Sequence, residues 1–234
     1  MKLNLHSDMQ IKALTIGEEK APLLVIDNFL DNADLLVEDA ASSTFLLEDG
    51  FYPGIRTQAP LAYQELILQT LEKKLLHSFN IDAAALYFSV CHYSIVTIIP
   101  AQLKLLQRIP HFDSPKKDSL AAVHYLFKED LGGTSFYRHR KTGYETIDEE
   151  RKIAYYTSLE SENDGPNMPK SAAGYINGDT ALYERIEKIP AVFNRLIIYR
   201  RNSLHSGSIP QNIVASDDPR KGRLTISSFI DCAP

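Results

Sequence analysis

The feature that most constrains the fold is a series of β-rich segments after about residue 84. Five stretches there are rich in β-branched and aromatic residues, which favour strands. They are "ALYFSVCHYSIVTII" (85–99), "SLAAVHYLF" (119–127), "TSFYRHR" (134–140), "VFNRLIIYR" (192–200) and "GRLTISSFI" (222–230). A "DLGG" stretch at 130–133 separates the second and third at hairpin distance. The pattern predicts an antiparallel barrel or sandwich in this part of the chain.

The first third of the chain predicts one strand and two helices. The apolar run from Leu23 to Phe29 is expected to be a strand. A helix ending near Ser43 should follow, because helix N-cap residue types come directly after the strand: Asp31, Asn32 and Asp34. A longer helix is predicted after Pro60. Its apolar stripe should cover a sheet and comprises Leu61, Leu68, Leu71, Leu75 and Phe79.

Two later segments, 146–160 and 178–189, also have helical patterns, and the polar stretch 161–174 between them is expected to be a loop. We therefore expect one domain over residues 1–234, of the α+β class. An N-terminal strand and helical layer should occupy about 1–83. The β core should occupy about 84–234, with a helical and loop insertion near 145–190.

Composition narrows the function classes. The 234 residues are 44% hydrophobic and 24% charged, with a net charge of −5 and no long basic run. Non-specific binding to nucleic acid or to anionic lipid is therefore not expected, although the composition does not exclude a local basic groove. Cys91 and Cys232, the two cysteines, lack CxxC spacing, which argues against disulfide scaffolding and cysteine-rich zinc sites. No signal-peptide pattern and no run of 18 apolar residues is visible, so a cytoplasmic location is predicted.

Candidate metal ligands are His111 and Asp113 in "PHFDS" and His205 in "NSLHSG". His-x-Asp or His-x-Glu occurs about once by chance in such a chain, and the second such pair, His6 and Asp8, is interpreted as incidental. His111 and Asp113 directly precede a predicted strand, where residues i and i+2 project to one side. Two imidazoles and one carboxylate can occupy one face of an octahedral metal and leave the opposite face open. The alternative is that these are ordinary hydrogen-bonded polar residues.

Arg223 adds a different kind of group. Alternation along 222–230 places Arg223, Thr225 and Ser227 on one face of the strand, opposite Leu224 and Ile226. A guanidinium beside two hydroxyls can bind a carboxylate through charge-assisted, bidentate hydrogen bonds. The alternative is an arginine that faces solvent at a strand edge.

Together these residues resemble a known family. The His-x-Asp pair, the distant histidine and an Arg-x-Thr 18 residues later are similar to the Fe(II)- and 2-oxoglutarate-dependent oxygenase superfamily. "VIDNFLDNADLL", "PHFDS", "HYLF", "GGTSF" and "LHSG" look prolyl-4-hydroxylase-like within it. "RIPHFDS" and "GGTSFYRHRKTGYE" further resemble an uncharacterised bacterial branch. The resemblance extends from about Val25 to Asp231.

The resemblance implies a double-stranded β-helix, a cupin-like jelly roll, with helices packed on one side. It also implies that Fe(II) is held by His111, Asp113 and His205, and that oxygen and 2-oxoglutarate are co-substrates of a hydroxylase. Arg223 would bind the distal carboxylate of 2-oxoglutarate, with Tyr125 and Thr225 as candidates for the same role. "YLF" in place of "YLN" and "GGTSF" in place of "GGET-F" argue against a proline-type substrate.

Other readings remain open from the sequence. They are a cupin-like metal protein without 2-oxoglutarate chemistry, a non-catalytic binding module and a nucleic-acid-modifying oxygenase. The substrate can be peptidyl, an amino acid or a small molecule, with neither membrane nor nucleic acid expected as a partner. A basic cluster of Arg138, His139, Arg140 and Lys141 is either an anion-binding feature or a solvated strand end. Tyr93 is predicted to pack in the core, and His124 to face away from Tyr125.

Overall fold

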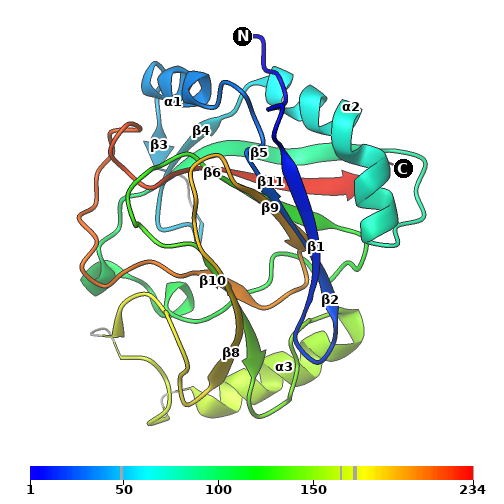
Figure 1. Ribbon diagram of the computed structural model, residues 1–234. Helices are drawn as coiled ribbons and strands as arrows, with labels where there is room; N and C mark the ends of the chain where they lie inside the picture. The colour runs from blue at the N-terminus through cyan, green and yellow to red at the C-terminus, as the bar shows by residue number, and fades with distance from the viewer. Residues whose placement is uncertain (48–49, 164, 171–172, 234) are drawn as a thin grey trace.

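The computed structural model describes residues 1–47, 50–163, 165–170 and 173–233, and consists of two antiparallel sheets with three α-helices (Figure 1). The eight-stranded sheet has the order β1-β2-β9-β6-β11-β5-β4-β3, and the three-stranded sheet the order β10-β7-β8. The strands of the larger sheet are β1 (Gln10–Ile16), β2 (Ala21–Asp27), β3 (Leu46–Leu47), β4 (Gly54–Gln58), β5 (Leu86–Val96), β6 (Leu120–Tyr125), β9 (Leu196–Arg200) and β11 (Leu224–Cys232). Those of the smaller sheet are β7 (Thr134–His139), β8 (Tyr183–Ile189) and β10 (His205–Gly207).

The two sheets pack against each other and enclose a core between them. Phe136 of β7 meets Tyr199 of β9 edge to face, with ring centroids 5.0 Å apart. Aromatic pairs in this geometry stabilise a core beyond the burial of their area. The predicted α+β class and double-stranded β-helix are confirmed by this arrangement.

A helical layer covers the outer face of the larger sheet (Figure 1). It consists of α1 (Asp34–Ala41) and α2 (Leu61–Ser78), whereas α3 (Glu149–Glu162) lies beside β8 of the smaller sheet. The buried side chains of α2 are spaced four residues apart: Tyr63, Ile67, Leu71 and Leu75. Four residues advance about 40° beyond a full turn, so this stripe winds around the helix. Leu61 therefore lies off the stripe at its N-terminal end and is 68% exposed, contrary to prediction.

The start of α1 also differs from the sequence pattern. Ala33 occupies the N-cap position without a side-chain hydrogen bond, and Asp34 is the first helical residue. The Asn32 side chain donates instead to the backbone oxygen of Lys2. The helix is therefore shorter than predicted and ends at Ala41.

The predicted alternation along β11 is confirmed. Leu224, Ile226 and Ile230 are buried in the core beneath the helical layer, whereas Thr225 and Ser227 line the cavity on the other face. The neighbouring strand β6 shows the same pattern. Its His124 is buried in the helical layer, where it stacks on Tyr63 of α2 with a 12° interplanar angle.

Two predictions for the β half are wrong. Residues 130–133 do not form a hairpin, because β6 and β7 belong to different sheets. The segment 178–189 contains β8 rather than a helix, since Tyr183–Ile189 pairs with β7. The structure also contains β1 and β4, which the sequence pattern did not predict.

The helix predicted over 146–160 is confirmed as α3, and it begins a few residues later. Its N-cap is Asp148, whose carboxylate accepts hydrogen bonds from the amides of Glu150 and Arg151 at 3.1 and 3.0 Å. Such bonds satisfy donors that have no partner within the helix. Among the described residues, no helix is long and apolar enough to span a membrane.

Candidate metal centre

The backbone brings the two distant histidines together. His111 and His205 form an antiparallel bridge, in which each amide donates to the other residue's carbonyl oxygen at 2.9 Å. Two residues further on, the amide of Asp113 donates to the carbonyl of Arg201 at 2.8 Å. The chain around 111–113 is therefore hydrogen-bonded to the chain around 201–205, although they are far apart in the sequence.

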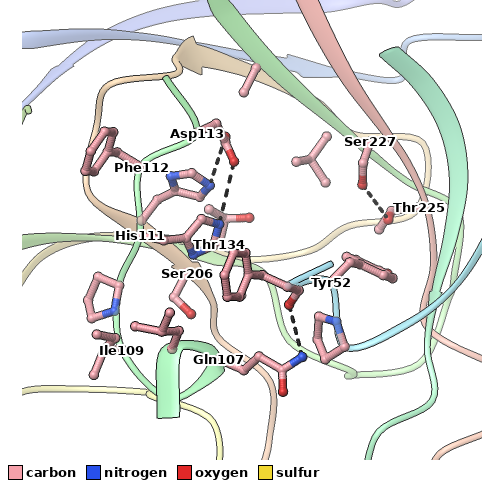
Figure 2. Close-up of a pocket in the computed structure, with 18 of the residues that line it drawn as sticks. Tyr52, Gln107, Ile109, His111, Phe112, Asp113, Thr134, Ser206, Thr225 and Ser227 are labelled. Carbon is pink, nitrogen blue, oxygen red and sulfur yellow. Dashed lines mark hydrogen bonds and ion pairs between the residues drawn. The ribbon is translucent and has the colours of Figure 1, made fainter. Parts of the chain in front are cut away.

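The side chains of His111, Asp113 and His205 converge from this ladder. One ligand atom from each lies within 4.8 Å of the other two. The Asp113 carboxylate oxygens lie 3.8 Å from His111 Nε2 and 3.6 Å from His205 Nε2, contacts drawn as dashed lines in Figure 2. The imidazole centroids are 4.4 Å apart. The described part of the chain holds no other cluster of three such groups.

The hydrogen bonding of His205 fixes which ring nitrogen faces the cluster. Its Nδ1 lies 2.9 Å from the carbonyl oxygen of Ser203. Because a carbonyl can only accept, Nδ1 is the donor in this bond, and Nε2 is the nitrogen that faces Asp113. This bond orients the ring in the way that is common for metal-binding histidines.

Electrostatics favour the neutral form of His111. Its ring is half-exposed to the pocket, yet burial among the protein atoms around it lowers the pKa of His111. Nearby His205 lowers this pKa further, and Asp113 raises it. A metal binds imidazole only in its neutral form, so a lowered pKa keeps this ring available as a ligand.

These three groups lie on the wall of a cavity of about 590 Å³. The metal-ligand candidates occupy one side of it, and Thr225 and Ser227 of β11 the other (Figure 2). Much of the remaining wall is aromatic or aliphatic: Phe51, Val90, Leu106, Phe112, Val123, Tyr155, Tyr156, Leu159, Tyr175 and Phe229. A largely apolar cavity with few polar groups is the usual form of a small-molecule site.

Arg223 lies on this cavity and is held rigidly. Its side chain is 6% exposed, and Nε donates to the carbonyl of Leu131 at 3.1 Å. Nη2 donates to the carbonyl of Gly133 at 3.0 Å, with Gly132 at 3.4 Å. These bonds use Nε and Nη2, while Nη1 takes part in none of them. The 130–133 segment, wrongly predicted as a hairpin, therefore orients the guanidinium.

Gly132 is required by this arrangement. Its φ of +80° is strained for residues with a side chain, and an added Cβ would lie 2.0 Å from the backbone oxygen of Ser208. The "GG" in "GGTSF" thus lets the Arg223-binding carbonyls approach the neighbouring chain.

The other two predicted co-substrate residues occupy different positions. Thr225 lines the cavity, and its hydroxyl makes long contacts of 3.4 Å to Ser94 O and Ser227 Oγ. Tyr125 is buried, and its hydroxyl bonds Thr134 Oγ1 at 2.8 Å. Thr134 is a lining residue and Tyr125 is not, so the structure places Tyr125 behind the wall.

Several residues singled out in the sequence lie away from the cavity. His6 and Asp8 form a local turn, with the Asp8 amide donating to His6 Nδ1 at 3.0 Å. Tyr93 packs in the core beneath the helices, as predicted, and its hydroxyl donates to Asp39 at 3.0 Å.

The basic cluster is part of the framework. Arg138 Nη2 pairs with the buried Glu145 at 2.5 Å, and its Nη1 pairs with Glu184 at 3.3 Å. His139 is buried against Tyr155 of α3, with ring centroids 5.3 Å apart. Arg140 pairs with Asp179 at 3.2 Å and Lys141 with Glu162 at 3.7 Å. These contacts tie β7 to its neighbours and lie outside the cavity lining.

Tyr52 and Arg56 are among the cavity residues that the sequence did not point to. They flank the start of β4, a strand that the sequence pattern did not predict. The Arg56 guanidinium lies 4.0 Å from the centroid of the Tyr52 ring. No local signal marks either residue, because only the fold brings β4 to the cavity.

Comparison with known proteins places the chain in a family. A family model described as a family of unknown function, DUF6445, matches residues 7–230. The chain belongs to this family. No curated protein matches the DUF6445 chain.

Solved structures resemble this DUF6445 protein in fold. One is the non-heme α-ketoglutarate-dependent epimerase SnoN from nogalamycin biosynthesis, with a TM-score of 0.53, 10% identity, and 92% of this chain and 80% of that chain covered. Another is HygX from Streptomyces hygroscopicus with nickel, 2-oxoglutarate and hygromycin B bound, with a TM-score of 0.48, 12% identity and coverage of 92% and 84%. At such identities the likeness to SnoN shows the fold of the 2-oxoglutarate-dependent oxygenases and nothing finer.

Proposed function

We propose that this DUF6445 protein is an Fe(II)- and 2-oxoglutarate-dependent oxygenase that hydroxylates a small-molecule, amino-acid or peptidyl substrate. One observation carries the proposal. The convergent imidazole–carboxylate–imidazole set lies on the same cavity as a buried arginine whose orientation is fixed by backbone carbonyls. The fold is consistent with this activity, although fold alone does not specify it.

The donor set fits a first-row divalent metal. Two neutral imidazoles and one carboxylate from one side of a cavity are typical ligands for non-haem Fe(II) with open coordination positions. The Ser203 carbonyl holds His205 in the tautomer that this role needs. Residues His111, Asp113 and His205 would hold the ion.

The remaining cavity residues would bind and orient the organic co-substrate. Arg223 offers a fixed cation to the distal carboxylate, and the hydroxyls of Thr225 and Ser227 lie on the same wall. When bound, iron supplies the centre at which 2-oxoglutarate is oxidatively decarboxylated to succinate and oxygen is activated for attack on the substrate. The aromatic side chains of Phe112 and Tyr156, whose centroids are 5.9 Å apart, would exclude water from the metal side of the cavity.

The first test is anaerobic titration of the purified protein with Fe(II) and 2-oxoglutarate. We expect the visible charge-transfer band of a 2-oxo acid chelated to Fe(II), and slow succinate formation once oxygen and ascorbate are added. His111→Ala should abolish both signals. His6→Ala, in the chain's other His-x-Asp pair, is the matched control and should retain both.

Two outcomes would contradict the proposal. One is a band that is as strong in the His111 variant as in the His6 variant, which would show that the signal does not come from this cluster. The other is unchanged 2-oxoglutarate turnover in Arg223→Leu. That result would leave a metal site without the proposed co-substrate anchor.

A further inference from the structure

One part of the cavity wall is formed by apolar side chains from α3 and from the segment that carries His111. We call it the apolar wall, and it consists of Leu106, Ile109, Phe112, Tyr155, Tyr156 and Leu159. The Phe112 ring centroid lies 6.1 Å from that of Tyr155 and 5.9 Å from that of Tyr156. Because Phe112 stands between His111 and Asp113 in the chain, this wall adjoins the candidate metal centre.

The apolar wall extends to the surface of the protein. Tyr156 is 49% exposed and Leu106 is 47% exposed. Phe51, which also lines the cavity, is 68% exposed, and its carbonyl accepts a hydrogen bond from the Gln107 side chain at 3.0 Å. Large apolar side chains that stay exposed together often mark a ligand-binding groove. The cavity volume of about 590 Å³ is in the range of sites for drug-sized ligands, so it has room for more than a small co-substrate.

The apolar wall carries no charged group. The charged or ionisable side chains among the described lining residues are His111, Asp113 and His205 at the candidate metal centre, together with Arg56 and Arg223. The Arg56 guanidinium lies over the Tyr52 ring, 4.0 Å from its centroid. An ammonium or carboxylate group placed against the apolar wall would lose its water and gain no partner, which is unfavourable. The wall therefore favours a neutral ligand.

A peptide fits this wall less well than a compact small molecule does. The backbone amides and carbonyls of a peptide need hydrogen-bond partners when they are buried. The Tyr155 hydroxyl is already engaged, since it lies 2.8 Å from the Tyr183 hydroxyl. Aromatic rings, by contrast, offer favourable edge-to-face or offset contacts to another ring.

We propose that the apolar wall binds a neutral, ring-bearing small molecule, and that this is the substrate class of the protein. The inference rests on the proposed function and narrows the substrate that it leaves open. It excludes a free amino acid, whose ammonium and carboxylate groups would both lie unpaired. Tyr156 is the specificity-determining residue, because its half-exposed ring can contact the ligand without supporting the core.

The test compares indole probes that share a ring system and differ in charge. Indole-3-acetamide is neutral, indole-3-acetate is an anion of nearly the same shape, and tryptamine is a cation. Because the chain contains no tryptophan, the indole emission is distinct from that of the protein. In fluorescence titrations of the Zn(II)- and 2-oxoglutarate-loaded protein, the amide should bind at least about tenfold more tightly than either charged probe.

Two variants of α3 locate the binding. Tyr156→Ser should weaken binding of indole-3-acetamide by about threefold to tenfold, as expected for the loss of one ring contact. Ile153→Ser is the matched control, because Ile153 is 77% exposed on the same helix and does not line the cavity. It should change the affinity by less than about twofold.

The outcomes separate this inference from the proposed function. The absorption band of Fe(II) with 2-oxoglutarate is recorded first for the same preparation. If no band forms, the proposed function fails, and the inference about its substrate fails with it. If the band forms but the anion or the cation binds as tightly as the amide, the inference alone is overturned. Equal effects of the Tyr156 and Ile153 substitutions would also overturn it.

Discussion

The free energy of unfolding should depend on pH through His124, which is fully buried beneath the helical layer. Its Nε2 lies 3.2 Å from Asn194 Oδ1, while Nδ1 has no partner among the described residues. The ring stacks on Tyr63 and meets Phe29 edge to face, with centroids 5.7 and 5.4 Å away. Burial lowers the pKa of His124 from 6.5 to about 4, and the bond to Asn194 opposes this only in part.

The sign and size of the effect follow from proton linkage. The unfolded chain takes up a proton near pH 6.5, while folded His124 does so only near pH 4. The stability associated with this residue is therefore complete above pH 6.5 and is lost as the pH falls toward 4. A pKa difference of about 2.5 corresponds to about 3.4 kcal/mol in total, of which about 2 kcal/mol is lost by pH 5.0.

His124→Phe removes this pH-dependent contribution to stability and keeps an aromatic ring stacked on Tyr63. The free energy of unfolding is measured by urea denaturation of the wild type and the variant at pH 7.5 and pH 5.0. From pH 7.5 to pH 5.0, the free energy of unfolding of the wild type should fall by about 2 kcal/mol more than that of the variant. An equal difference at both pH values would refute the reasoning, because contributions from all other groups cancel in the comparison.

Three further predictions concern the framework and the metal. In thermal unfolding, Gly143→Ala should destabilise the fold by ~1–2 kcal/mol. Gly132→Ala should destabilise it by considerably more. Both glycines have positive φ, but only Gly132 lacks room for a Cβ. Glu145→Gln should cost about 3 kcal/mol in urea unfolding, against less than about 1 kcal/mol for the more exposed Glu184→Gln. Mn(II) at a hundred times its dissociation constant should raise the unfolding free energy by about 2.7 kcal/mol, and Asp113→Ala should abolish this gain.

Local alternation was the most reliable guide from sequence to structure. The two faces of 222–230 were predicted correctly, because a period of two depends only on extended backbone. The segment 178–189 was predicted wrongly, since its Glu, Arg and Lys residues favour a helix in isolation. Pairing of β8 with β7, and the contact of Glu184 with Arg138, outweigh that local preference.

In the candidate site too, some residues were predicted from the sequence and others were not. The sequence pointed to His111, Asp113 and His205 through a motif, and the fold brings them together; their role as ligands stays a proposal. Tyr52 gave no signal, because its proximity to the cavity depends on how β4 pairs with β5. Tyr125 was predicted from its place in a motif, which cannot show that Thr134 stands in front of it.

The main-chain pairing of His111 with His205 fixes the distance between the two Cα atoms that carry the imidazoles. Opposed residues that exchange both hydrogen bonds have Cα atoms about 5.5 Å apart, whereas diagonal neighbours are about 7–8 Å apart. The Cα atoms of the two histidines are thus held at a set distance by main-chain hydrogen bonds rather than by side-chain packing. A substitution that removes either ring leaves this main-chain spacing intact, so the variant should keep its fold. If the two histidines bind a metal as proposed, added imidazole should restore part of the metal binding that the variant loses.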